Sequence, residues 1–93
     1  MRITFAHDKR ANKAHYKVRH GNIKEGEFEE VLSRPIVVFS RRKRVLKAVG
    51  RTLAGRFLTV VFIRVSNNHY HVITGWPSNR SQILIWHREW LKR

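Results

Sequence analysis

Apolar and polar residues alternate most regularly in the middle of the chain. The alternation predicts four strands, at Ile36–Ser40, Val45–Arg51, Arg56–Val65 and His69–Gly75. Short turns separate them, and the last of these turns, Ser66-Asn67-Asn68, is rich in residues that favour turns. Strands joined in this way pair antiparallel, so we expect a β-meander of about four strands. The third strand is apolar on both faces and should be covered on both.

Helical patterns flank the meander. Asp8 predicts the start of a helix through about His20, because its carboxylate can accept the free amides of the first turn. Asn22 followed by Glu25 resembles a capping box for a second helix through about Leu32, whose acids lie opposite its apolar face. Pro35 ends that helix.

Both ends of the chain add one more element each. Ser78 predicts the start of a final helix to about Leu91, and Arg2–Phe5 fits either a short strand or an extended arm. Two N-terminal helices, an antiparallel meander and a C-terminal helix make an α+β fold. A chain of 93 residues has room for one domain, which we expect to span 1–93.

The charge is strongly positive and extends over sequence that is expected to fold. Lys and Arg number 20 against 6 Asp and Glu, which gives a formal charge of +14. The segment Arg41–Arg56 holds seven cations and no carboxylate, and it runs directly into the central strand. Cations on a sheet cannot spread apart as on a disordered tail, so a polyanionic partner such as nucleic acid is expected. An anionic membrane and an acidic protein are the other classes of partner.

Several classes of function are excluded or disfavoured. The chain has no cysteine, which rules out disulfides, thiol catalysis and cysteine zinc sites. The N-terminus lacks the apolar segment of a signal peptide, and the longest apolar run, Val60–Ile63, is far too short to span a bilayer. We therefore expect a cytoplasmic protein without membrane contact. Trp86–Arg93 does mix tryptophan and cations in the style of an interfacial peptide, but the apolar central strand favours a folded soluble domain.

Histidines and arginines supply the candidate chemistry. RNA cleavage without a metal needs a base for the 2′-hydroxyl, cations for the phosphorane and an acid for the leaving oxygen. Histidine suits the proton steps and arginine pairs with phosphate oxygens. His69 and His71 share one face of a strand, and His20 ends the first helix. The candidate catalytic residues are His20, Arg51, Arg56, His69 and His71.

Each of these assignments has an alternative. His69 and His71 also fit a solvated strand end, or a metal pair, although no carboxylate or cysteine lies nearby in sequence to complete a metal site. We expect neither metal nor cofactor. Arg56 could contact phosphate or form an ion pair with the acidic second helix, and Arg51 is similar. His20 could simply be a helix-end residue.

A second group of residues is expected to bind RNA without reacting. The cluster after the first meander strand should contact RNA or a protein partner, or else is only a basic turn. Trp76 precedes a proline at a strand-to-helix junction, where it could stack on a nucleotide. Trp86 and Trp90 fit the core better than a stacking role. The candidate RNA-binding residues are Arg41, Arg42, Lys43, Arg44, Lys47, Arg64, Trp76 and Arg80.

One segment resembles a known family. Residues 49–62 read Val-Gly-Arg-Thr-Leu-Ala-Gly-Arg-Phe-Leu-Thr-Val-Val-Phe. This is similar to the pattern I-G-x-T-x-x-G-R-x-L-x-V-V-F of the BrnT family of bacterial toxins. Arg19-His20-Gly21, Phe28-Glu29-Glu30-Val31 and His71-Val72-Ile73-Thr74 resemble further family segments in the same order. Trp76 stands where the family has an arginine.

The resemblance implies a RelE-like ribonuclease fold and metal-independent RNA cleavage. It also implies a type II toxin–antitoxin system, in which a cognate DNA-binding antitoxin forms a hetero-oligomer with the toxin. The substrate would be mRNA, free or bound to the ribosome. The main alternative is a basic RNA- or DNA-binding module without chemistry, which needs the charge but not the histidines.

Overall fold

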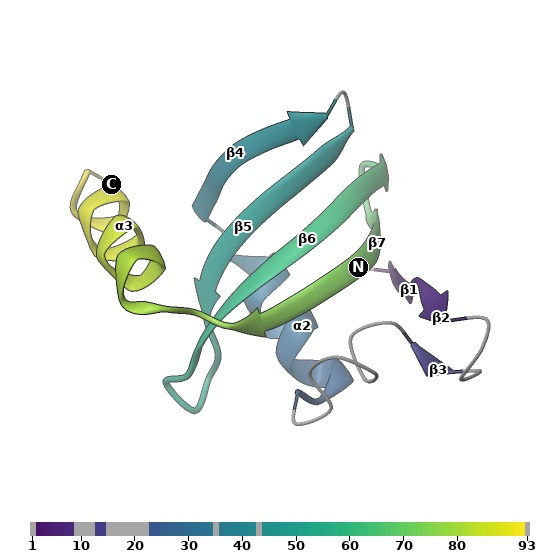
Figure 1. The fold of residues 1–93 in the computed structure, drawn as a ribbon, viewed down its shortest axis with the longest axis horizontal. Coiled ribbons are helices and arrows are strands. Elements are labelled where there is room, and N and C mark those ends of the chain that lie inside the picture. Colours follow the sequence, from purple (N-terminus) through teal and green to yellow (C-terminus); the bar gives the residue numbers. More distant parts are fainter. Residues whose placement is uncertain (1, 9–12, 15–22, 35, 43, 93) are drawn as a thin grey trace.

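The structure is a computed structural model that describes residues 2–8, 13–14, 23–34, 36–42 and 44–92, with backbone alone at 7–8, 13–14 and 37–42. The fold is α+β. A mixed five-stranded sheet has the strand order β1-β7-β6-β5-β4 (Figure 1). Its strands are β1 (Arg2–Phe5), β4 (Ile36–Arg42), β5 (Val45–Arg51), β6 (Phe57–Ser66) and β7 (His69–Pro77). Helix α2 (Glu25–Ser33) lies behind the sheet and α3 (Arg80–Leu91) lies beside one end of it.

The antiparallel meander β4–β7 is confirmed. Its four strands begin and end within two residues of the expected positions, and Asn67-Asn68 form the β6–β7 turn. The β5–β6 turn closes with a hydrogen bond from the Gly55 amide to the Thr52 carbonyl at 2.9 Å. Gly55 has a φ of 91°, which side chains disfavour, so the glycine is required for this turn.

β1 is a strand, and it lies parallel to β7. Arg2 is the register partner of His69, and Thr4 is the partner of His71. Backbone amides secure both ends, because Arg2 donates to the Asn68 carbonyl at 2.7 Å and Ala6 donates to the Val72 carbonyl at 2.8 Å. The sheet is therefore mixed, not purely antiparallel.

The predicted helix from Asp8 to His20 is wrong where the structure describes it. β2 (His7–Asp8) and β3 (Lys13–Ala14) form a small antiparallel ladder instead. Lys13 and Ala14 are paired as a strand in this ladder, so a helix from Asp8 to His20 cannot run through them. The other residues of this segment lie outside the described ones.

The second predicted helix is confirmed, with a shifted start. α2 begins at Glu25 after the N-cap residue Lys24. The Lys24 amide donates to the Glu27 carboxylate at 3.0 Å, so Glu27 has the capping role expected of Glu25. Asn22 and Pro35, which were expected to bound this helix, lie outside the described residues.

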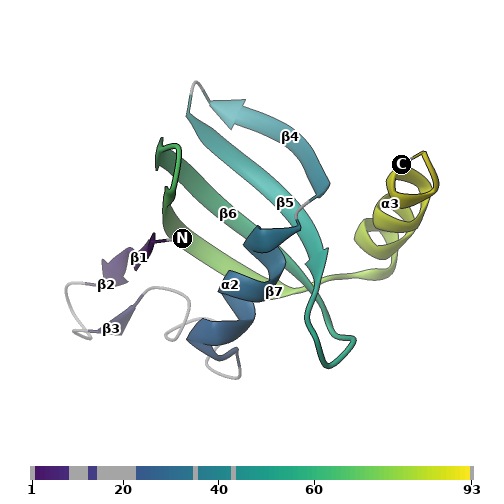
Figure 2. The same cartoon turned by 180° about the vertical axis from the view of Figure 1, so that it is seen from behind.

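α2 covers one face of the sheet (Figure 2). Its apolar side packs against side chains that alternate along β5, β6 and β7. The fully buried members of this core are Phe28, Val31, Ala48, Leu58, Val60 and Val72. Neither α2 nor α3 is long and apolar enough to cross a bilayer.

α3 covers only one end of the other face. Trp86 packs there against Ile36, Val49 and Phe57, with 5.0 Å between the Trp86 and Phe57 rings. The expectation that β6 is covered on both faces therefore holds near Phe57, whereas farther along the strand no helix among the described residues covers this face. The rest of this face, lined by Thr4, Lys47, Val61, Ile63, His71 and Trp76, is called the open face below.

A buried polar network joins α3 to the sheet. The N-cap is Asn79 and not Ser78, because the Asn79 side chain accepts from the Gln82 amide at 2.9 Å. The Gln82 side-chain oxygen accepts from the Thr59 hydroxyl and the Asn79 amide, both at 2.9 Å. Ser78 instead shares a hydrogen bond with Thr59 at 2.8 Å.

Gln82→Leu is expected to lower the free energy of unfolding by about 1–3 kcal/mol, because it leaves buried donors without an acceptor. Urea denaturation measures the change. Ser81→Ala, at an exposed position in the same helical turn, is the control and should change stability by less than about 0.5 kcal/mol. A Gln82→Leu protein as stable as the unmodified one would contradict the role of this network.

The edge strand β4 is irregular. Its pairing with β5 shifts register between Val37 and Phe39 and again between Ser40 and Arg42. Such shifts bend a strand and interrupt its hydrogen-bond ladder.

Candidate functional site

Two histidines meet at one hydroxyl on the open face. The Thr4 Oγ1 lies 3.0 Å from the Nε2 atom of His69 and 2.7 Å from the Nδ1 atom of His71. All three side chains are partly buried. The hydroxyl can accept a hydrogen bond from one ring and donate one to the other, which gives the two rings different roles. A pair with one ring neutral and the other protonated can accept a proton at the first ring and donate one from the second.

The parallel pairing of β1 with β7 builds this arrangement and adds an arginine to it. Arg2 precedes Thr4 by two residues and so shares its face of the strand, and it is the register partner of His69. Arg2 is exposed. We call Arg2, Thr4, His69 and His71 the histidine cluster. Sequence reasoning missed Arg2 and Thr4, although the polar–apolar alternation of Arg2–Phe5 was a signal for a strand with one polar face.

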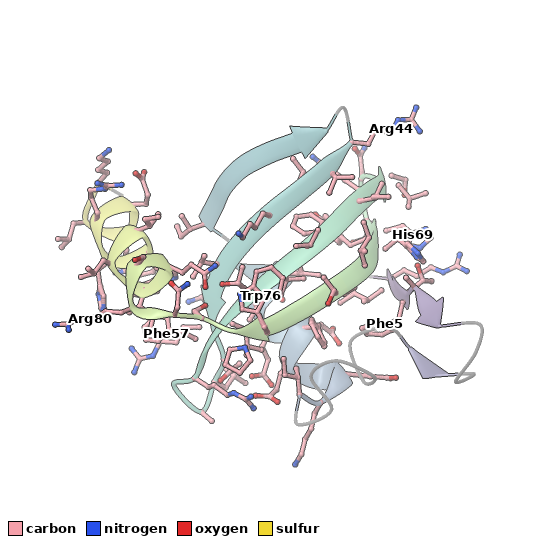
Figure 3. All side chains as sticks on the ribbon, in the orientation of Figure 1. Phe5, Arg44, Phe57, His69, Trp76 and Arg80 are labelled. Carbon is pink, nitrogen blue, oxygen red and sulfur yellow. The ribbon has the colours of Figure 1, made fainter. Side chains whose placement is uncertain are left out.

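The basic turn between β4 and β5 lies at the same end of the sheet. The register places Arg42, Val45, Ile63, His71 and Thr4 in one row across all five strands. The backbones of Arg42 and His71 are three strand spacings apart in this row, which is about 14 Å. Arg44 is exposed at this end, as is visible in Figure 3. Arg41 and Arg42 are described by their backbone in β4, and Lys43 lies outside the described residues.

Lys47 and Trp76 come together in the middle of the open face. The Lys47 ammonium lies 5.2 Å from the centroid of the Trp76 ring, a cation–π distance. The Trp76 indole N–H also donates to the Gln82 side chain at 3.4 Å. An indole held in this way is partly exposed and presents an aromatic surface next to a cation.

Arg51 and Arg56 are not near the histidines. Arg51 pairs with Phe57, six residues along β6 from the partner of His71, so it lies about 20 Å away along the strand. The Arg51 guanidinium lies 5.6 Å from the Phe57 ring. The predicted catalytic residues are thus divided between the two ends of the sheet, and His20 lies outside the described residues.

Arg56 forms the ion pair that was the alternative to phosphate contact. Its Nη1 atom lies 3.4 Å from the Glu27 Oε1 atom on α2. The same carboxylate caps α2, so the contact joins the start of β6 to the start of that helix. The acidic second helix therefore accounts for Arg56 structurally.

The remaining two candidates lie apart from the cluster. Arg64 pairs with Tyr70. The Tyr70 ring packs against the Phe62 ring, with centroids 5.6 Å apart, on the face of the sheet that α2 covers. By alternation, Arg64 faces away from the open face. Arg80 is exposed at the first residue of α3, far from the labelled His69 in Figure 3.

Arg56→Gln is expected to cost no more than about 1 kcal/mol of stability, as for other partly exposed ion pairs. If the protein binds RNA, as its sequence predicts, the substitution should leave that affinity within about twofold. Filter binding with labelled RNA and urea denaturation measure the two quantities. Arg44→Gln is the matched comparison, and it should weaken RNA binding without lowering stability. A loss of RNA affinity in Arg56→Gln greater than that in Arg44→Gln would show that Arg56 contacts RNA.

Within the described part of the chain, no three histidine, aspartate or glutamate side chains gather as they would around a metal ion. The arrangement is one of paired imidazoles on β7, with Arg2 as the backbone register partner of His69 on β1. No family model, no curated protein and no solved structure matches this chain.

Proposed function

We propose that this protein binds RNA across the open face and cleaves it without a metal at the histidine cluster. The observation that carries the proposal is the meeting of His69 and His71 at the Thr4 hydroxyl, at the sheet end that also bears the basic turn. The formal charge of +14 supports a polyanionic substrate. The resemblance to the BrnT family and its RelE-like fold supports RNA as that polyanion.

In the proposed reaction, one imidazole takes the proton from a 2′-hydroxyl, whose oxygen attacks the adjacent phosphorus. The second ring, which enters the reaction protonated as an imidazolium, donates a proton to the 5′-oxygen as its bond to phosphorus breaks and becomes neutral. The products are a 2′,3′-cyclic phosphate and a 5′-hydroxyl. Arg2, beside His69, binds the phosphate oxygens as their negative charge grows. Thr4 positions both rings.

The basic turn and the aromatic pair give the substrate its path. Arg44 and its neighbours attract the phosphates at one edge, and the row across the sheet leads from there to His71. Trp76 supplies a ring for a base, and Lys47 supplies a cation for the adjacent phosphate. Following the family resemblance, an acidic DNA-binding antitoxin would cover this same face and form a hetero-oligomer with the protein.

The purified protein should cleave single-stranded RNA in excess chelator and leave 2′,3′-cyclic phosphate ends. RNA with 2′-O-methyl groups should bind but remain intact, because it lacks the attacking hydroxyl. Binding should weaken with salt, with a log–log slope of about −0.7 for each phosphate contacted. Intact RNA at every protein concentration, under conditions where binding is measured, would refute the enzymatic part of the proposal.

A binding module without chemistry is the second candidate. The separation of Arg51 and Arg56 from the histidines favours it, because two of the expected phosphate-stabilising cations are remote from any proton donor. This candidate predicts salt-dependent RNA affinity without cleavage. Replacing both His69 and His71 would then leave the RNA affinity unchanged and alter only local packing.

A further inference from the structure

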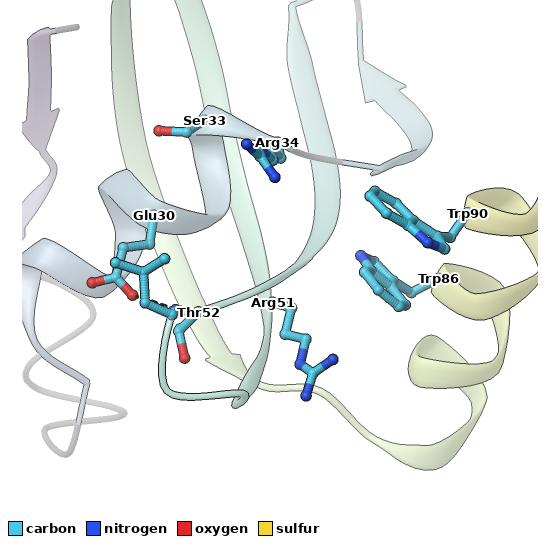
Figure 4. A pocket seen from close by; sticks show the side chains of 8 residues that line it. Glu30, Ser33, Arg34, Arg51, Thr52, Trp86 and Trp90 are labelled. Carbon is cyan, nitrogen blue, oxygen red and sulfur yellow. Dashed lines mark hydrogen bonds between the residues drawn. The ribbon is translucent and has the colours of Figure 1, made fainter. Parts of the chain in front are cut away.

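A groove at the opposite end of the sheet carries two stacked tryptophans. It lies between α2, the end of β5 and α3, with a volume of about 520 Å³ (Figure 4). Trp86 and Trp90 are 5.3 Å apart at their ring centroids and nearly parallel, at 7°. Trp86 is buried as core, whereas Trp90 is 48% exposed. The stack thus begins in the core and ends at an accessible indole on the wall of the groove.

The charges of the groove suit an anion. Arg34 and Arg51 line it, and within the described residues neither forms an ion pair. Among the described residues that line the groove, the one carboxylate is that of Glu30, whose Oε1 atom accepts the Leu53 amide at 2.8 Å. Figure 4 shows Arg51 between the two helices, with both indoles on the α3 side. Cations therefore outnumber the acid, and that acid already has a partner.

We infer that this groove binds an unpaired base of an RNA strand, stacked on Trp90, with Arg34 and Arg51 contacting the flanking phosphate. A parallel aromatic stack that ends at an exposed indole fits a planar base, which extends the stack by one ring. The inference rests on the proposed RNA binding and adds a second contact point. The groove lies about 20 Å along the sheet from His71, so it would hold a nucleotide outside the cleavage site.

The test uses a fluorescent 2′-O-methyl oligonucleotide of about eight nucleotides, which spans a typical single-strand site and cannot be cleaved. An abasic oligonucleotide of the same length and charge serves as the partner ligand. The unmodified protein should bind the base-bearing strand about tenfold more tightly. Trp90→Ala should remove at least half of that difference on a logarithmic scale, and Trp90→Phe should retain most of it. Leu84→Ala, an exposed apolar change on the same helix outside the groove lining, should leave both affinities unchanged.

The two ligands separate this inference from the proposed function. Affinity for the abasic strand reports the charge-driven RNA binding. The difference between the strands reports base stacking at Trp76 and in the groove together, and the part of that difference that Trp90→Ala removes reports the groove. If Trp90→Ala changes neither affinity, or lowers both equally, the base subsite is refuted while RNA binding stands. If Trp90→Ala instead converts a dimer to a monomer by light scattering, the exposed indole belongs to a protein interface and the inference is also overturned.

Discussion

His71→Ala is expected to slow RNA cleavage by roughly 10²–10⁴-fold, which is the usual contribution of one positioned proton-transfer group. The His71 ring lies 2.7 Å from Thr4 and contributes half of the paired imidazoles. RNA affinity should stay within about twofold, because the basic turn and Lys47 remain. Cleavage is measured with end-labelled RNA in chelator, and affinity is measured with the 2′-O-methyl strand.

His87→Ala is the matched control, since His87 is an exposed histidine on α3 and lies outside the cluster. It should cleave as the unmodified protein does. Thr4→Val keeps the shape of the side chain and removes the bridging hydroxyl, so it should slow cleavage by about tenfold without weakening binding. Equal cleavage rates for His71→Ala, His87→Ala and the unmodified protein would place the chemistry elsewhere, or show that the activity comes from a contaminant.

Phe28→Ala is expected to lower the free energy of unfolding by about 3–5 kcal/mol, a large part of the roughly 5–14 kcal/mol expected for a chain of this length. Phe28 is completely buried and joins α2 to the sheet. Its ring meets Phe5 edge to face, with centroids 5.6 Å apart, so the loss also loosens β1. Denaturant titration followed by circular dichroism measures the change. Leu53→Ala, at a 91% exposed position, is the control and should change the free energy of unfolding by less than about 0.5 kcal/mol.

Gly75 allows a sharper test of the same contact. A β-carbon at Gly75 would lie 2.5 Å from the Phe28 ring, so Gly75→Ala alone should be destabilising. In the Phe28→Ala background the closest contact is removed and the Thr59 carbonyl oxygen, 3.2 Å from the added β-carbon, remains, so Gly75→Ala should then cost less. The double-mutant cycle should give a coupling of about 1 kcal/mol or more. Additive effects would show that α2 does not press on β7 at this point.

The local pattern was enough to predict the meander and the last two helices. Alternation over 36–77 and the Asn67-Asn68 turn are short-range signals, and so is the helical spacing around Trp86. The prediction of a helix from Asp8 was wrong. An aspartate that can cap a helix can equally lie in a strand, and here it pairs in the β2–β3 ladder. Local propensity is overridden when tertiary pairing offers the backbone other partners.

The candidate site was only partly predictable, for a related reason. Alternation places His69 and His71 on one face, but Thr4 reaches them from 65 and 67 residues away in the chain. No local pattern shows that β1 will pair parallel to β7. The choice between phosphate and Glu27 as the partner of Arg56 likewise depended on where α2 crosses the sheet.

The two register shifts in β4 have a consequence for how copies of the molecule meet. An outermost strand with unpaired amides invites another sheet to continue the ladder, and a flat, regular one leads towards fibrils. In β4 the register shifts break that template twice within seven residues. A solution of this protein should therefore resist ordered aggregation even when concentrated, and thioflavin fluorescence should stay at its baseline.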